Sequence, residues 1–262
     1  MSAKFNPEPA AQLLADAFRS GALLTELPAE CRPQTLNDGY EIQDRFTALL
    51  GDNFAGWKLG VGTVNGKKMT GSSRALAARL LGSRMFKDGD TVPMPNSAPV
   101  TIEFEIACVL GRDVAPGDQI ANPLDAVASA QVDFELVLSR YVDRRTVGWP
   151  SFCADLVGFS ALVLGQSVPV DAAAFAKIAN SAVISVDGKE MARIATGDDA
   201  IDPVLGLSEL FEHARERGIT LKKGTLVSTG TLTLPFNTSG AAVLVEAHFD
   251  GGKLSARTNP KA

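Results

Sequence analysis

The sequence has few of the residues on which several common kinds of site depend. Histidine occurs only at positions 213 and 248, so histidine-rich metal sites and most histidine-based triads are nearly excluded. The three cysteines are odd in number and lack Cys-x-x-Cys spacing, which argues against a disulfide scaffold and suits a reducing compartment. His213 lies in the polar run Glu-His-Ala-Arg-Glu-Arg, and we expect it to be a solvated helix residue.

Basic blocks and long apolar runs are also missing. The net charge is −5 and no stretch is strongly basic, so the electrostatic pattern of a nucleic-acid-binding protein is absent. Neither a signal-peptide pattern nor an apolar run of about 18 residues occurs, and we therefore expect a cytoplasmic protein that does not enter a membrane. With 262 residues, of which 45% are hydrophobic, the chain can bury a sizeable core.

Apolar residues at helical spacing predict helices near the N-terminus. Asn6 can cap a helix that has Pro7 at its first position, and residues 11–18 carry an apolar stripe. A second helix is predicted from about Asn37 to a C-terminal stop at Gly51. These features predict a small helical region over residues 1–52.

After residue 52 the pattern changes to short strands with a few helices. Helices are predicted at 123–130 and at 202–217, and hairpin turns at Asp187-Gly188 and at Asp250-Gly251-Gly252. Strands do not alternate strictly with helices, which argues against a doubly wound parallel sheet. We predict an α+β protein in which the helical region leads into a mostly β, roll-like domain over residues 53–262. The expected strands are 55–61, 91–93, 100–110, 132–138, 160–164, 182–186, 226–228 and 242–249.

Three glutamates stand out within the predicted strands. Side chains alternate along a strand, so Glu103 and Glu105 point to one face, roughly 6.6 Å apart. Two like charges in an apolar segment are costly unless a cation neutralises them. With Glu135 on a neighbouring strand, three oxygen ligands could hold Mg²⁺ or Mn²⁺. A solvated sheet face that carries acids explains the same spacing.

Several motifs follow one another in an order that resembles a known family. They are Gly56-Trp57-Lys58-Leu59-Gly60, the segments 102–113 and 134–141, Ala154-Asp155, Val204-Leu-Gly206, and Gly224-Thr-Leu-Val-Ser-Thr229-Gly230. Together they resemble the 2-keto-4-pentenoate hydratase and 4-oxalocrotonate decarboxylase branch of the fumarylacetoacetate hydrolase superfamily. The resemblance covers nearly the whole chain from about residue 35 onward.

The resemblance implies a fold and a chemistry. It implies the β roll of the fumarylacetoacetate hydrolase C-terminal type, with Mg²⁺ or Mn²⁺ bound by Glu103, Glu105 and Glu135 and chelated by a small 2-oxo acid. The implied activity is that of a hydro-lyase that hydrates a 2-keto-4-pentenoate-type substrate in the catabolism of aromatic compounds. Homo-oligomers, and complexes with a partner enzyme of the same pathway, are further expectations from the family.

The resemblance also assigns roles to individual residues. Lys58 would transfer a proton or bind the substrate carboxylate, although an edge-strand lysine that blocks aggregation would look the same. Gly60 would allow close approach of a ligand. Asp155 matches a family aspartate and would be catalytic, with a helix or turn cap as the alternative.

Other matched positions are expected to bind substrate. Arg140 would act there or pair with a site carboxylate, and a surface ion pair is the alternative. Gly206, Thr229 and Gly230 would line the pocket, and a structural turn is the alternative for both glycines.

The chain departs from the family in the segment 73–82. The hydratases carry an acid there, assigned to acid–base work, and this chain has none. General acid–base groups contribute about 10²–10⁴ in rate, so the departure affects the expected reaction. Decarboxylation or C–C hydrolysis of a 2-oxo acid, or a non-catalytic keto-acid-binding partner subunit, are therefore alternatives. Arg74 or Arg79 either contacts an extra acidic group of a different substrate or is solvated on a helix.

Overall fold

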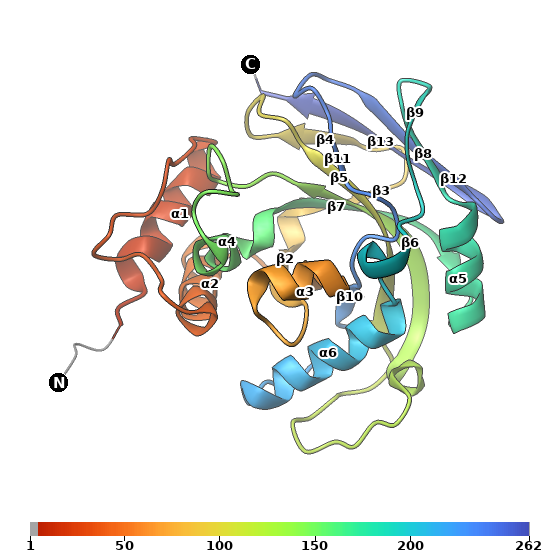
Figure 1. The fold of residues 1–262 in the computed structure, drawn as a ribbon, viewed down its shortest axis with the longest axis horizontal. Helices are drawn as coiled ribbons and strands as arrows, with labels where there is room; N and C mark the ends of the chain where they lie inside the picture. Colours follow the sequence, from red (N-terminus) through yellow and green to blue (C-terminus); the bar gives the residue numbers. More distant parts are fainter. Residues whose placement is uncertain (1–4, 262) are drawn as a thin grey trace.

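A computed structural model describes residues 5–261 and combines two twisted sheets with helices on their outer faces (Figure 1). Helices are present where the sequence predicted them in the N-terminal region and in the segment 202–217. None of the helices within the described residues is long and apolar enough to span a membrane. The α-helices are α1 (Glu8–Ser20), α2 (Leu36–Leu50), α3 (Val64–Thr70), α4 (Trp149–Ala154), α5 (Ala172–Ser181) and α6 (Pro203–Glu216).

The larger sheet carries the residues predicted to form the site. Its strands follow the order β2-β1-β10-β5-β6-β7-β3, and β11 pairs with β5. The central pair β5 and β6 is antiparallel, whereas β1 and β10 run parallel. The strands are β1 (Phe54–Gly60), β2 (Leu76–Leu81), β3 (Met85–Lys87), β5 (Thr101–Leu110), β6 (Val127–Val137), β7 (Phe159–Val168), β10 (Leu226–Ser228) and β11 (Phe236–Asn237).

The smaller sheet packs across one face of the larger one. Its order is β4-β13-β12-β8-β9, and both predicted hairpin turns connect strands of this sheet. Phe104 and Phe134 pack edge to face at 5.8 Å, and Phe249 of the smaller sheet lies 5.5 Å from Phe104. The strands are β4 (Thr91–Met94), β8 (Val183–Val186), β9 (Lys189–Arg193), β12 (Leu244–Phe249) and β13 (Gly252–Pro260).

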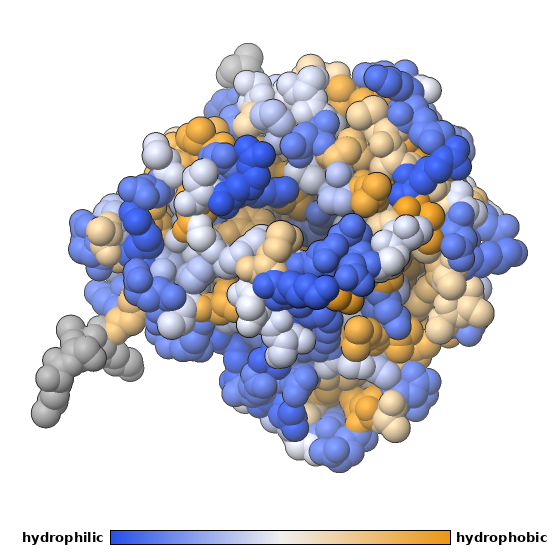
Figure 2. Space-filling view, viewed as in Figure 1, coloured by the Kyte–Doolittle hydropathy of each residue, from blue (hydrophilic) through white to orange (hydrophobic). Residues whose placement is uncertain are grey.

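The opposite face of the larger sheet meets the N-terminal helices. Apolar residues of α1, α2 and α4 share one buried cluster with β2 and β7. Thr35 caps α2 in a reciprocal capping box with Asp38, and Gly51 ends the helix in a left-handed conformation. The division of the chain at residue 52 stays a prediction. On the side of the molecule shown in Figure 2, hydrophilic residues predominate and apolar ones are scattered among them.

Alternation along β5 and β6 separates an apolar face from an acidic one. Ile102, Phe104 and Ile106 join the core between the sheets, so Glu103 and Glu105 point to the other face. On β6, Phe134 faces the same core and Glu135 the acidic side. Packing of the apolar face therefore fixes the register that brings the acids together.

Two predictions were wrong. The segment 123–130 forms a short 3₁₀ turn (Pro123–Ala126) and then enters β6, because residues from Val127 onward pair with β5. Pairing in the sheet here outweighs the helical pattern. His213 is not solvated: it is 3% exposed on α6, 4.6 Å from the ring of Tyr40, and burial lowers its pKa to about 4.

Substitution of Gly56 tests how closely the backbone of β1 approaches that of β10. A Cβ at this position, where φ is +154°, would lie 2.1 Å from the carbonyl oxygen of Leu226. We expect Gly56→Ala to lower the free energy of unfolding by at least about 3 kcal/mol in urea titrations. Gly71 (φ +66°) is the control, because its Cβ would meet nothing within 4 Å, and Gly71→Ala should cost about 1 kcal/mol. Equal losses in the two variants would contradict the close approach.

Candidate metal centre and active-site cavity

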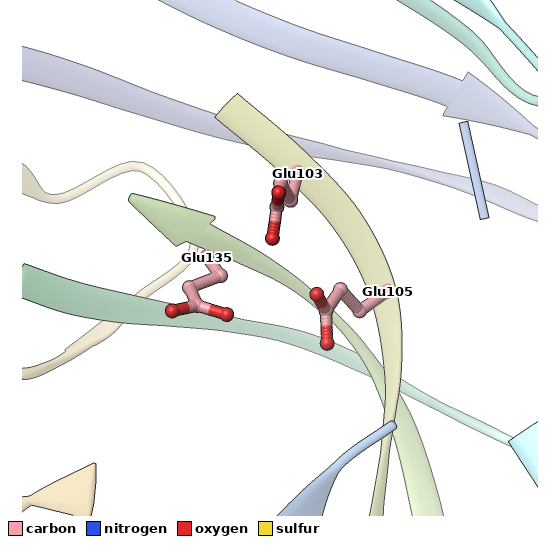
Figure 3. A group of neighbouring side chains, drawn as sticks. All are labelled: Glu103, Glu105 and Glu135. Atoms are coloured by element: carbon pink, nitrogen blue, oxygen red, sulfur yellow. The ribbon is translucent and has the colours of Figure 1, made fainter. Parts of the chain in front are cut away.

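Three glutamates from two adjacent strands converge on one point (Figure 3). Glu103 lies directly opposite Glu135 in the antiparallel pairing, and Glu105 is two residues further along β5. One carboxylate oxygen from each lies within 4.8 Å of the other two. Glu105 and Glu135 are fully buried, whereas Glu103 is partly exposed. We call these three residues the carboxylate cradle.

The cradle has the features that a divalent cation requires. Among the described residues, Glu105 Oε1 and Glu135 Oε2 are buried without a hydrogen-bond partner. Burial, together with the neighbouring acids, raises the pKa of Glu105 well above its usual value; burial likewise raises the pKa of Glu135, against the opposing effect of Lys58. Carboxylate oxygens are the ligands that Mg²⁺, Mn²⁺ and Ca²⁺ prefer. The residues present therefore fit such an ion, which would supply the missing partners.

Lys58 provides a positive charge beside the cradle. Its side chain is 1% exposed, and Nζ lies 3.0 Å from Glu135 Oε1 and donates to the Val157 carbonyl at 3.2 Å. Strand β1 lies between β2 and β10, so the edge-strand explanation for this lysine does not apply. Gly60 leaves the space that Lys58 needs, because a Cβ there would lie 3.1 Å from Nζ and 2.8 Å from Val157 Cγ1.

A fourth buried acid, which the sequence analysis missed, stands behind the cradle. Asp133 pairs across the strands with Glu105, and Ser228 Oγ lies 2.7 Å from Asp133 Oδ2 and 2.5 Å from Glu105 Oε2. Burial raises the pKa of Asp133 from 3.8 to about 8. Since one hydroxyl hydrogen cannot serve two carboxylates, one of the two acids must carry a proton in this arrangement.

A cavity of about 350 Å³ opens from the cradle. Lys58 and Glu103 reach its wall, and so do the half-buried Arg144 and the exposed Asp199, neither of which the sequence analysis had singled out. Most of the remaining wall is apolar. It includes Val61, Met69, Val137, Trp149, Phe152, Val157, Leu234 and Pro235.

The predicted substrate-binding residues lie in different places. Gly60 lines the cavity, and the Gly230 N–H donates to Glu105 Oε2 at 2.8 Å. Thr229 Oγ1 donates to the Ile106 carbonyl at 2.8 Å, and Thr229 and Gly206 border a separate cavity of about 100 Å³. Gly230 thus orients a cradle ligand, while the substrate-binding roles stay predictions.

Arg140 and Asp155 form a buried pair outside the residues that line the cavity. The Asp155 carboxylate pairs with the Arg140 guanidinium and accepts from Ser139 Oγ at 2.6 Å and from the Arg140 N–H at 3.0 Å. Burial raises the pKa of Asp155, and the charge of Arg140 opposes that rise. Arg140 is therefore no surface ion pair, and a catalytic role for Asp155 stays a prediction.

The pair holds an unusual turn. Leu156 and Val157, directly after Asp155, both have left-handed backbone conformations, with φ values of 53° and 51°. A β-branched residue rarely adopts this conformation and keeps it only where its surroundings impose it. The Arg140 guanidinium donates to the carbonyls of Asp155 and Phe159, which flank this turn, and the carbonyl of Val157 within the turn accepts from Lys58.

Arg74 and Arg79 do not line the cavity. Residues 76–81 form strand β2 rather than a helix. Arg74 pairs with Glu216 of α6, and Arg79 Nη2 lies 2.8 Å from Asp44 Oδ1 of α2. Neither cation is available for an acidic group of the substrate.

The buried acids predict a pH dependence for the metal-free protein. A carboxyl group whose pKa is higher in the folded chain than in the unfolded chain binds more protons when folded, so stability falls as pH rises between the two values. For Asp133 that interval runs from 3.8 to about 8. In EDTA, we expect urea titrations to show a loss of a few kcal/mol across it. Saturating Mg²⁺ should reduce the loss, and Asp133→Asn should flatten part of it. Constant stability of the chelated protein would contradict these shifts.

Comparison with known proteins places this geometry in a family. The chain is 28% identical over 242 residues to a 2-keto-4-pentenoate hydratase of Burkholderia vietnamiensis, covering 91% of each protein. It is 27% identical to a 2-keto-4-pentenoate hydratase of Paraburkholderia phymatum, over 93% of this chain and 94% of that one.

Among solved structures, a 4-oxalocrotonate decarboxylase from Pseudomonas putida G7, complexed with magnesium and adipate, has the same fold. The TM-score is 0.82, the identity is 19%, and 97% of both chains is covered. The family model described as fumarylacetoacetate hydrolase C-terminal matches residues 80–256, well over half of the chain. The protein therefore belongs to the fumarylacetoacetate hydrolase C-terminal family.

Proposed function

We propose that this protein is a divalent-metal-dependent lyase that hydrates a 2-hydroxydienoate derived from a 2-keto-4-pentenoate-type acid. The observation that carries the proposal is the buried cradle with unpartnered oxygens, which meets Lys58 at the wall of a mostly apolar cavity. The hydratases of similar sequence support hydration. Mg²⁺ or Mn²⁺ is the proposed ion, and a homo-oligomer in the cytoplasm remains the expectation from the family.

Each group in the cavity has a separate task in the proposed reaction. A divalent cation held by Glu103, Glu105 and Glu135 would act as a Lewis acid toward the 2-oxo group. Lys58 can donate a hydrogen bond or a proton at Nζ, because it lies between Glu135 and the open cavity. The apolar side chains of the wall would lower the local dielectric around a bound oxo acid, which strengthens its electrostatic contacts.

Decarboxylation of a 2-oxo acid is the second candidate. Hydration needs a proton donor for the distal carbon. Strand β2 lies in the segment where the resemblance led us to expect an acid, and it contributes no residue to the cavity wall. Besides Glu103, the described carboxylate on this wall is Asp199, which is exposed and accepts from Asn65 Nδ2 at 2.8 Å. Release of CO₂ would distinguish this reaction from addition of water.

Glu103→Ala tests the cradle with the least risk to the fold, because Glu103 is partly exposed. We expect metal-dependent turnover of 2-hydroxypenta-2,4-dienoate or another 2-oxo acid, followed by absorbance, to disappear in this variant. Calorimetry should show weaker Mg²⁺ binding, since a ligand is lost. Tight binding of metal and oxalate without turnover of any substrate in a panel would contradict the lyase assignment and favour a non-catalytic keto-acid-binding subunit.

Lys58→Met tests the role of the ammonium group. We expect kcat to fall about 10²–10⁴-fold, the usual contribution of an acid–base group. Mg²⁺ affinity should not weaken, because removal of a neighbouring cation lowers repulsion of the ion. Lys222→Met is the control, since Lys222 is 72% exposed and pairs with Asp113. If kcat stayed at the wild-type value, Lys58 would have no part in the reaction.

A further inference from the structure

A second cavity, of about 410 Å³, lies apart from the active-site cavity and shares none of its lining residues. It is bordered by the C-terminal end of α1, the segment 93–96 and the end of β13, and we call it the α1 cavity. Leu138 lies on its wall, whereas the preceding residue, Val137, lines the active-site cavity. Since neighbouring side chains of an extended chain point to opposite faces, the two cavities lie on opposite sides of this segment.

The α1 cavity holds cations and no acid. Arg84, Arg140 and the exposed Lys261 line it, and none of its other lining residues is Asp or Glu. Within residues 5–261, no carboxylate oxygen comes within 4.0 Å of the Arg84 guanidinium, which donates from Nε to the Ser160 carbonyl at 2.7 Å and from Nη2 to the Pro93 carbonyl at 2.9 Å. A guanidinium has five N–H groups, so most donors of Arg84 have no partner among these residues.

The two arginines are held close together at the start of β7. Arg140 Nη1 donates to the Phe159 carbonyl at 2.6 Å, and Arg84 donates to the next carbonyl along the chain. Burial, together with the charge of Arg140, lowers the pKa of Arg84, against the opposing effect of Asp52. Because Asp155 balances Arg140, the unbalanced charge inside the wall is that of Arg84. An anion bound here would offset the repulsion between the two guanidinium groups and accept from their free N–H groups.

The remaining wall determines which kind of anion fits. It is mostly apolar and includes Phe18, Leu23, Met94, Leu138 and Pro260. A single unbalanced guanidinium matches a monoanion, and its planar fork matches the two oxygens of a carboxylate. The volume is that of an ordinary small-molecule site, in which apolar walls surround a few polar groups. An apolar body that bears one carboxylate therefore suits the α1 cavity in size, polarity and charge.

We propose that the α1 cavity is a second ligand site, which binds a small monocarboxylic acid with an apolar body through Arg84 and Arg140. Arg84 supplies the unbalanced charge. Arg140 contributes the N–H groups that it does not use to hold Asp155 and Phe159. The proposal does not rest on the proposed function, since the α1 cavity shares no residue with the active-site cavity.

Benzoate and benzamide test this site, because the two molecules have nearly the same shape and differ in charge. In titrations of the full-length protein followed by NMR of the ligand, benzoate should bind about 10–100-fold more tightly than benzamide, as expected for a charge-assisted contact. The affinity for benzoate should be the same in EDTA as in Mg²⁺ with saturating oxalate, because the α1 cavity is separate from the cradle. Equal affinities for benzoate and benzamide, or displacement of benzoate by oxalate, would overturn the proposal.

Substitutions locate the bound benzoate. Arg84→Met should weaken benzoate about 10–100-fold and leave benzamide unchanged, because it removes the charge that selects the anion. In Ala22→Trp, the new side chain should block the cavity to both ligands and leave the fold intact, since Ala22 is exposed and lines the cavity. Arg193→Met is the matched control and should keep the wild-type affinities, because Arg193 is 61% exposed, pairs with Glu190 and lines neither cavity.

The remaining outcomes are also decisive. Wild-type affinity for benzoate in Arg84→Met or in Ala22→Trp would place the ligand elsewhere and overturn the proposal. If Arg84→Met does not fold, Ala22→Trp decides alone. Equal weakening in Arg84→Met and Arg193→Met would mean that overall charge, and not a contact in the α1 cavity, attracts benzoate. Failure of benzoate to bind the wild-type protein would overturn the second site and leave the proposed function standing.

Discussion

The gathering of four carboxyl groups, three of them buried, on one face of two strands is the constraint on which the rest of the site depends. Glu103 pairs with Glu135 and Glu105 with Asp133, on either side of the Phe104–Phe134 pair of β5 and β6, and the ammonium of Lys58 lies beside Glu135. The opposite face is packed against the smaller sheet through Phe104 and Phe134, so neither strand can turn its acids to solvent. A shift of one residue would turn the acids into the apolar core between the sheets and place Phe104 and Phe134 on the site face.

Much of the surrounding structure serves to hold this face in place. The N–H of Gly230 and the hydroxyl of Ser228 both donate to Glu105, and both belong to the segment at and after β10. On the other side of the cradle, Arg140, paired with Asp155, donates to the carbonyls that flank the turn whose carbonyl at Val157 accepts from Lys58. Such support orients the site but does not touch the active-site cavity, which explains why Arg140 and Asp155 are buried away from it.

The cradle and most of the fold could be predicted from the sequence. These predictions succeeded where the spacing of apolar and polar residues along a strand or helix shows which face each side chain occupies. Alternation placed Glu103 and Glu105 on one face, and the same rule, applied to β6, would have added Asp133 beside Glu135. Arg144 lies in an irregular segment, where no periodic pattern relates a side chain to the sheet. His213 has charged neighbours along the chain, yet α6 turns it toward Tyr40 and Trp57, a tertiary contact invisible to local polarity.

The charges on this face also determine what kind of ion can fit. The Ser228 hydroxyl lies between Glu105 and Asp133, so these two acids must share one proton there. Of the four acids, three then keep a negative charge, against one ammonium at Lys58. A monovalent ion would leave a buried net charge, and a trivalent ion would reverse its sign, each of which is costly in an apolar interior. A divalent cation would balance these charges before substrate enters, so the charge count supports the proposed kind of ion as much as the type of ligand does.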